Sequence, residues 1–404
     1  MKNGELKIAN DRLTHTMLKN KNKGITLVAL VITIIILLIL AGISISALTN
    51  TGIFGKAKDA KQKSANAELD QNTKLDEYEN EIDNYLPKKN NNKTVEQAKE
   101  KVLSTEKNTE LVDAKENKIV IPAGFKITGD ATTVDKGIVI EDATVDKDGK
   151  PTATAGSQFV WIPVGTITKA DGTETTITLE RYDFDYSTGA ESVYSGSYIV
   201  EEDANNPSTL KNIEGKSIAK NITNFKNSVK ANGGYYIGRY EARTTTPRND
   251  IGNDLTQITE KGTDQVYNYV KQQQAAQLAQ GMYTSNNFTS DLMNSYAWDT
   301  ATLFLQNCGT NKKYSIKNSF NSSLLQTGTN ALRETKKIDK QCNVYDMASN
   351  VGEWTTETST SHSNFPCVRM GGDYNDISDI TSNRISSRTS NSNDYVGFRP
   401  LLYL

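Results

Sequence analysis

The first part of the chain has a long apolar stretch with polar sequence on both sides. Residues 25–47 are almost wholly apolar, and no charged residue lies between Lys23 and Lys56. About 20 apolar residues span the hydrocarbon core of a bilayer as a helix, so this pattern predicts a transmembrane helix. Basic residues before it predict a cytoplasmic N-terminus, and hence a cell-surface location for the C-terminal domain of a single-pass protein. A secretory signal peptide, the alternative, would have a shorter apolar core ending at a small-residue cleavage site.

The segment that follows has helical spacing. Residues 57–86 are rich in helix-forming types. Apolar residues recur there at alternating spacings of three and four, at Leu75, Tyr78, Ile82 and Tyr85. This spacing indicates a narrow packing seam on a helix, which Pro87 is expected to end. The pattern therefore predicts one extended helix over residues 25–86 and a polar linker over residues 87–116.

From residue 117 onward the pattern changes to short β-like runs separated by Gly, Asn and Asp. The runs "KIVIPAGFKIT", "GIVIED", "SQFVWIPVG" and "GGYYIGRYEA" are typical of strands. The stretches "DQVYNYVKQQQAAQLAQGM" and "SDLMNSYAWDTATLFLQ" favour helices. Residues 117–404 are therefore predicted to form an α+β domain with short strands and long loops.

Composition narrows the candidate chemistry. The chain has 46 basic and 48 acidic side chains, which gives a net charge of −2 and no indication of a nucleic-acid partner. The two histidines, His15 and His362, are too few for a multi-histidine metal site. The three cysteines, Cys308, Cys342 and Cys367, match neither a CxxC site nor a disulfide framework. Buried free thiols are expected, and one disulfide is the alternative.

The basic leader and the apolar stretch resemble a known family. The leader ends in Lys-Gly and is followed by "ITLVALVITIIILLILAG", which resembles type IV prepilins and pseudopilins. The resemblance implies a leader over residues 1–24, cleavage after Gly24 by a prepilin peptidase, and methylation of Ile25. Ala29 stands where the family carries a glutamate that pairs with a neighbouring subunit's terminal amine. We therefore expect a membrane-anchored protein or a minor subunit rather than a filament shaft.

Four later segments resemble a second family. They are similar in order to the formylglycine-generating enzyme, or sulfatase-modifying factor, domain, at residues 159–165, 233–242, 343–355 and 369–400. The resemblance implies a C-type-lectin-like fold over residues 117–404. Enzymatic relatives need two cysteines near the C-terminal segment or three histidines. This chain has no cysteine after Cys367, and His362 is the only histidine of the domain, so we expect no catalysis.

The same resemblance implies a structural calcium site in "YDMASNVGEW". Its ligands would be the side chains of Asp346 and Glu353 and the carbonyls of Ser349 and Val351, which supply the oxygen atoms that calcium prefers. The alternative is that the two acids only hydrogen-bond the loop. Arg399 lies among apolar residues, and we expect it to pair with a buried acid or with carbonyls.

The C-terminal run, defined as residues 373–395, uses only Asp, Tyr, Asn, Ile, Ser, Thr and Arg. Tyr, Ser and Asn dominate antibody paratopes, so the run predicts a ligand-binding surface. The expected contact residues are Tyr374, Asn375, Asp376, Asn383, Arg384, Arg388, Asn391, Asn393 and Tyr395. By its composition and expected place in the fold, the run resembles the variable segment of diversity-generating retroelement target proteins. A plain polar loop in an Asn- and Ser-rich protein is the alternative.

Together these patterns predict a prepilin-processed, membrane-anchored surface protein with a non-catalytic, lectin-like binding domain. Its ligand would be an extracellular protein or glycan. Two alternatives stay open at this point. One is a structural minor pilin of a type IV pilus or type II secretion-like system, in contact with other pilins. The other is a formylglycine-generating-type oxidoreductase with a divergent site.

Overall fold

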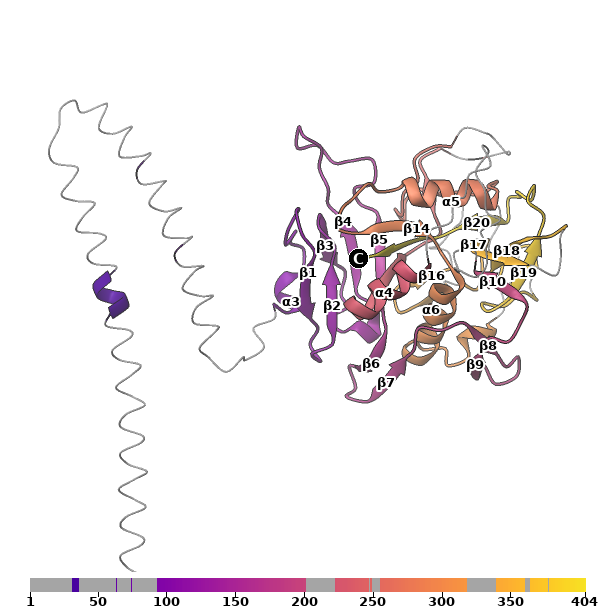
Figure 1. Cartoon of the computed structure of the whole chain (residues 1–404), viewed down its shortest axis with the longest axis horizontal. Coiled ribbons are helices and arrows are strands. Elements are labelled where there is room, and N and C mark those ends of the chain that lie inside the picture. The colour runs from indigo at the N-terminus through magenta and orange to yellow at the C-terminus, as the bar shows by residue number, and fades with distance from the viewer. Residues whose placement is uncertain are drawn as a thin grey trace, which may run out of the picture. The chain divides into compact units, whose positions relative to one another are not determined.

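The structure, a computed structural model, describes residues 31–35, 63, 74, 93–200, 222–246, 248, 255–317, 339–359, 364–376 and 378–404. The chain divides into two compact units, Met1–Asn91 and Asn92–Leu404 (Figure 1). The described residues of the first unit are helical. The second unit contains every strand that the structure describes. The account below concerns this second unit.

The predicted N-terminal anchor needs a correction. Among the residues that the structure describes, no helix has the length and apolar character needed to cross a bilayer. Residues 31–35, 63 and 74 are the described parts of the range predicted as one helix, and Gly24, Ile25 and Ala29 lie outside the described residues. We therefore do not carry further the long membrane-spanning helix of the predicted fold class, the membrane anchor or the single-pass location.

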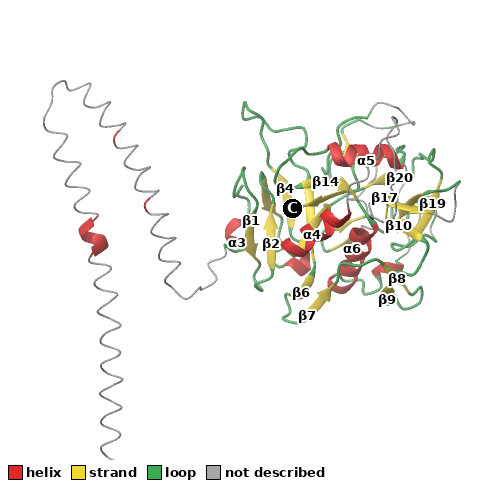
Figure 2. Ribbon diagram, viewed as in Figure 1, coloured by secondary structure: helices red, strands yellow, loops and turns green. Residues whose placement is uncertain are grey.

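The second unit is rich in strands and has few helices among its described residues (Figure 2). Its helices are α3 (Val95–Ala98), α4 (Ile222–Asn232), α5 (Gln272–Gly281) and α6 (Ser295–Cys308), with 3₁₀ turns at Val134–Lys136 and Tyr314–Ile316. The unit begins at Asn92, and Thr94 already bridges Val112. Part of the range predicted as a linker, residues 87–116, thus belongs to this unit.

A six-stranded sheet with the order β14-β21-β11-β5-β4-β3 forms the centre of the unit. Its strands are β3 (Phe125–Thr128), β4 (Val139–Asp142), β5 (Gln158–Pro163), β11 (Gly234–Gly238), β14 (Thr289–Leu292) and β21 (Pro400–Tyr403), all paired antiparallel. Every residue of β11 is buried. A strand that is covered on both faces reads as a continuous apolar run, which is why "GGYYIG" predicted it correctly.

A second sheet carries the C-terminal run. It contains β10 (Tyr198–Val200), β17 (Gly352–Ser359), β18 (Cys367–Met370), β19 (Arg384–Ser387) and β20 (Val396–Phe398). The pairs β10–β17, β17–β18 and β18–β19 are antiparallel, and β20 lies parallel to β17. After β20 the chain passes Arg399 and enters β21 of the central sheet. The last strands therefore connect the two sheets.

Five two-stranded ladders complete the described strands. They are β1 (Thr109–Val112) with β2 (Lys118–Ile121), β6 (Gly165–Thr168) with β7 (Glu174–Ile177), β8 (Tyr182–Phe184) with β9 (Glu191–Val193), β12 (Arg243–Thr244) with β13 (Gln265–Val266), and β15 (Lys340–Gln341) with β16 (Val344–Tyr345). The β8–β9 hairpin lies close to β19, because the Arg384 guanidinium donates to the Tyr182 carbonyl.

The helices cover the sheets, and the apolar side chains between them form one main cluster. α4 packs on β11, α5 on β14 and β17, and α6 on β5 and β17. The two predicted helical stretches each begin as a strand, since β13 precedes α5 and β14 precedes α6. The Asn294 side chain accepts from the Ala297 amide and caps α6, which fixes where that helix starts.

Candidate ligand-binding surface

The C-terminal run leaves the second sheet twice, and each excursion forms a loop. The first loop lies between β18 and β19, and the second lies between β19 and β20 (yellow in Figure 1). Gly371 starts the first loop with φ +84°, and a Cβ there would lie 2.6 Å from the Met347 carbonyl oxygen. Only glycine meets both requirements, so the backbone turns sharply at the border of the run.

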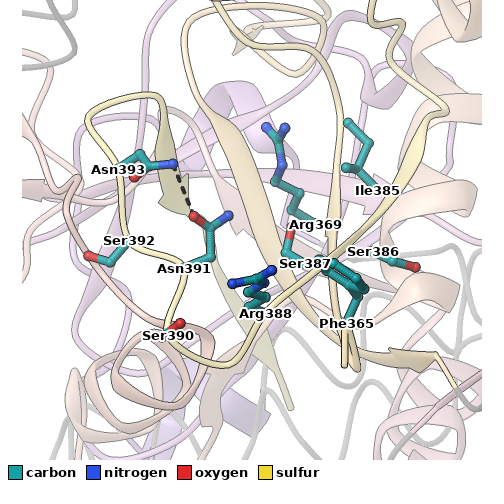
Figure 3. Close-up of a pocket in the computed structure, with 10 residues that line it drawn as sticks. All are labelled: Phe365, Arg369, Ile385, Ser386, Ser387, Arg388, Ser390, Asn391, Ser392 and Asn393. Atoms are coloured by element: carbon teal, nitrogen blue, oxygen red, sulfur yellow. Dashed lines mark hydrogen bonds between the residues drawn. The ribbon is translucent and has the colours of Figure 1, made fainter. Parts of the chain in front are cut away.

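A hollow of about 390 Å³ lies beside β19 and the second loop. Its polar neutral lining residues are Ser386, Ser387, Ser390, Asn391, Ser392 and Asn393. Arg369, Arg388, Phe365 and Ile385 complete the lining. In Figure 3 the second loop follows one side of the hollow, and Phe365 and β19 follow the other. The run therefore supplies most of this surface.

Arg388 is the exposed cation of the hollow. Its guanidinium carbon lies 5.3 Å from the centroid of the Phe365 ring, and Phe365 itself is 39% exposed. No ion pair holds Arg388 among the residues that the structure describes. An arginine against an aromatic face is held weakly and keeps its hydrogen-bond donors free for another molecule.

The second loop is braced by its own side chains. The Asn393 amide nitrogen donates to Asn391 Oδ1 at 3.0 Å (Figure 3). It also donates to the Tyr395 hydroxyl at 2.6 Å. The Tyr269 amide donates to the Asn393 carbonyl at 3.1 Å. Asn391, Asn393 and Tyr395 are half-buried. These contacts hold the loop in one shape, which lowers the entropic cost of binding.

The exposed side chains of the first loop include Asn375 and Asp376. Their amides donate to Asp373 Oδ1 at 2.8 Å and 3.0 Å, so the buried Asp373 carboxylate shapes the turn. The Tyr374 hydroxyl donates to Asp394 and connects this loop to the second one. Hydrogen bonds from Ser378, the side-chain bond first, lower the pKa of Asp376, so this exposed carboxylate stays charged at neutral pH.

Arg384 lies in a different environment from the expected contact surface. Its side chain is 7% exposed, and its guanidinium pairs with Asp299 and Glu357. Arg181 pairs with the same Glu357, and both guanidinium carbons lie over the Tyr194 ring, at 4.2 Å and 4.3 Å. All three guanidinium nitrogens of Arg384 donate to partners within the unit, so Arg384 supports the surface and is left out of the proposed contacts.

The buried Asp299 carboxylate near β19 is only partly compensated by its partners. Burial raises the pKa of Asp299 to about 7, and Glu357 adds to the shift while Arg384 opposes it. The Asp299 carboxylate accepts from the Tyr182 amide at 2.8 Å and from Arg384, while its Oδ1 has no partner among the described residues. A buried carboxylate with one oxygen unpaired takes up a proton more readily than an exposed one.

The structure thus divides the nine predicted contact residues. Arg388, Asn391 and Asn393 line the hollow, whereas Asn375 and Asp376 form the other exposed tip. Tyr374, Asn383 and Tyr395 are half-buried and brace the loops, with Asn383 donating to Asp379 at 3.0 Å. Sequence reasoning missed several lining residues: Phe365, Arg369, Ile385, Ser386, Ser387, Ser390 and Ser392. Phe365 and Arg369 precede the run, so its composition could not reveal them.

The loop predicted to hold calcium has another arrangement. Both Glu353 carboxylate oxygens accept from Arg399, at 2.6 Å and 3.1 Å. Asp346 Oδ2 has no partner among the described residues, and the Ser349 hydroxyl is 3.5 Å from Asp346 Oδ1. The described residues contain no group of three or more His, Cys, Asp or Glu placed to hold a metal. The calcium site predicted at Asp346, Ser349, Val351 and Glu353 stays a prediction, and it has no part in the proposals below.

The same pair confirms the prediction for Arg399. Its guanidinium binds the Glu353 carboxylate and also donates to the carbonyls of Gly238 and Tyr345, both at 2.8 Å. All of these groups lie where the chain passes from β20 to β21. Because a buried charge is tolerated only when its donors are paired, this arrangement secures the junction of the two sheets.

The three cysteines are free thiols in the structure. Burial raises the pKa of Cys308 to about 12, and burial also raises the pKa of Cys342. Cys367 is buried in β18. Because the thiolate is the reactive form, Cys308 and Cys342 are poor nucleophiles at neutral pH.

Comparison with known proteins adds little to this geometry. No protein-family model and no curated protein matches the chain. Among solved structures, the chain is similar to Treponema denticola variable protein 1, with 14% identity, a TM-score of 0.32, and coverage of 63% of this chain and 99% of that one. It is also similar to the crystal structure of CarF, with 15% identity, a TM-score of 0.25, and coverage of 34% and 66%. Similarities this weak carry no argument about function. The pilin and formylglycine-generating assignments find no support in these comparisons, and the pilin assignment is withdrawn together with the membrane anchor.

Proposed function

We propose that the second unit is a ligand-binding module whose contact surface is the exposed part of the C-terminal run. Its two parts are the tip formed by Asn375 and Asp376, and the hollow beside Arg388 and Asn391. The observation that carries the proposal is a hollow with a mostly polar lining and the exposed Arg388 at its edge, on loops that are themselves held in place. Protein recognition surfaces are commonly built from loops that are rich in Tyr, Ser and Asn and are already ordered before the ligand binds.

The module is proposed to bind without turnover. Its hollow contains neither a histidine nor a cysteine nor a carboxylate among the lining residues. General acid–base and nucleophilic catalysis need one of these groups beside the substrate in most enzymes. The ligand is proposed to be a protein or a glycan, because both present polar groups that Ser, Asn and Arg can meet.

Diversification of the run is part of the same proposal. The exposed positions of the two loops can change without disturbing the buried contacts, since their side chains face solvent. Sequences of this gene from related strains would test the point. Changes at Asn375, Asp376, Arg388 and Ser390, with Asp373 and Arg384 kept, are expected; changes spread evenly over the second unit would contradict it.

The binding proposal is tested with a fourfold variant of the contact surface, carrying Asn375→Ala, Asp376→Ala, Arg388→Ala and Ser390→Ala. The full chain and the variant are applied to arrays of glycans and of peptides. We expect signals that the variant loses, while its circular dichroism and thermal unfolding stay those of the parent.

A matched control removes four exposed side chains elsewhere, with Lys147→Ala, Asp148→Ala, Thr284→Ala and Asn286→Ala, and it has the same net charge as the contact variant. The control is expected to keep every signal. Arrays on which the parent binds nothing, or on which both variants lose the same signals, would contradict the proposal.

A further inference from the structure

The hollow beside β19 is positively charged. Two of its ten lining residues are arginines, and none is a carboxylate. Arg369 donates to the Asp373 carboxylate, which partly neutralises the charge of Arg369. Arg388 has no such partner among the described residues and is exposed at the edge. The charge that faces solvent from this hollow is therefore that of Arg388.

The geometry around Arg388 suits an oxyanion. A guanidinium carries five N–H donors in a planar fork, which matches the two oxygens of a carboxylate. The Phe365 ring lies within range of a cation–π contact with this guanidinium, with the guanidinium carbon 5.3 Å from the ring centroid. A ligand group that carries a negative charge would complete the ion pair that the protein leaves open.

The rest of the lining selects among anionic ligands. Four serines and two asparagines line the hollow. Their hydroxyl and amide groups both donate and accept hydrogen bonds. The Ser392 hydroxyl is buried with no partner among the described residues. An acidic side chain of a peptide offers only acceptors to such a lining, whereas sugar hydroxyls also donate, so a polyhydroxylated ligand satisfies more of these groups.

We infer that this hollow binds an acidic saccharide, a sugar ring that carries a carboxylate, with Arg388 as the anchor of that carboxylate. The inference rests on the proposed function and names the ligand class of the same site. The serine and asparagine side chains meet the ring hydroxyls, and the exposed part of Phe365 meets the C–H groups of the ring.

The test compares sugars that differ only in charge. The full chain is titrated with the methyl glycosides of glucuronic and galacturonic acid and with those of glucose and galactose, and binding is followed by saturation-transfer NMR. At least one of the acidic sugars is expected to bind at least about tenfold more tightly than its neutral counterpart, since hydrogen bonds to charged groups are worth that much.

Two variants locate the effect. Arg388→Ala is expected to remove the preference for the acidic sugar, while Arg388→Lys keeps part of it because the charge remains without the fork. Lys150→Ala removes one exposed positive charge outside the hollow and is the control, with the preference unchanged. An acidic preference that survives Arg388→Ala, or that Lys150→Ala also removes, would overturn the inference.

A peptide arm separates the ligand classes and the two proposals. Acetyl-triglutamyl amide is expected to bind more weakly than the acidic sugar; tighter binding would replace the saccharide by an acidic peptide. Equal binding of acidic and neutral sugars, or none of either, overturns the inference as well. If array signals still depend on the fourfold contact variant, the proposed function stands while this inference fails.

Discussion

Arg384 and Arg388 lie four residues apart in the same run, and the structure gives them opposite roles. Arg384 is the first residue of β19, and its guanidinium is surrounded by Asp299, Glu357 and the Tyr194 ring. Arg388 follows the end of β19, is exposed, and has its guanidinium against the Phe365 ring. Arg384 belongs to β19, and strand pairing directs its side chain inward. Arg388 lies beyond the end of this strand, and its side chain is exposed.

The difference shows that a run of uniform composition can combine two functions. Its buried members, such as Asp373 and Thr381, shape and anchor the loops: Thr381 donates to the Tyr314 carbonyl at 2.7 Å and accepts from Trp298 at 3.0 Å. Its exposed members face solvent, where a ligand can contact them. A contact surface of this kind can change its sequence at some positions while the frame keeps the loops in place.

The largest expected effect concerns Arg384. Arg384→Ala leaves Asp299 and Glu357 buried with one cation fewer, and breaking a buried pair in this way costs about 3–5 kcal/mol. Chemical denaturation of the parent and the variant measures the free energy of unfolding. A loss below about 1 kcal/mol would show that Arg384 is not part of the frame.

A pH dependence follows from Asp299. Its folded pKa, about 7, is above its ordinary value of 3.8, so between these values the folded state binds more protons than the unfolded one. The free energy of unfolding from this group therefore rises as the pH falls through 7, by about 1.4 kcal/mol per pH unit at most. The difference between the parent and Asp299→Asn, measured from pH 8 to pH 5, should show this slope; parallel curves would contradict it.

Tyr374 connects the first loop to the second loop, and its substitution is expected to lower the stability less than that of Arg384. Tyr374→Phe removes the hydroxyl that donates to Asp394 and connects the two loops. Loss of such a hydrogen bond costs about 1 kcal/mol of unfolding free energy. Thermal unfolding measures this change, and an unchanged midpoint would show that the loops are held independently of each other.

Arg388 should show the smallest effect on stability. Arg388→Ala removes an exposed side chain without an ion-pair partner among the described residues, and such substitutions stay within about 0.5 kcal/mol. The same denaturation experiment as for Arg384 gives the value. A loss above about 2 kcal/mol would place Arg388 in the frame and remove the contrast between the two arginines.

Local sequence predicted the central strands but not every feature of the fold. The short apolar runs at β2–β5 and β11 predict strands, and the structure confirms these strands. The stretches before α5 and α6 were predicted as helix, yet they pair as β13 and β14 with strands far away in the chain. The apolar stretch near the N-terminus predicted a membrane span that the described residues do not contain.

The site was predictable in position but not in detail. Composition alone located the run, because its seven residue types stand out against the flanking apolar strands. It could not separate Arg384 from Arg388, since Asp299 lies 85 residues away from Arg384 in sequence. Phe365 and Arg369 enter the hollow because β18 pairs with β19, a contact that no local pattern reveals.

The division of the run is tested most directly by scoring every single substitution at residues 373–395 for protease resistance in a display library. Resistance should be kept for most substitutions at Asn375, Asp376, Ser378, Arg388, Thr389 and Ser390, which are exposed, and lost for most at Asp373, Thr381 and Arg384. A profile that is equally tolerant at all of these positions, or equally intolerant, would contradict a buried frame that carries a free contact surface.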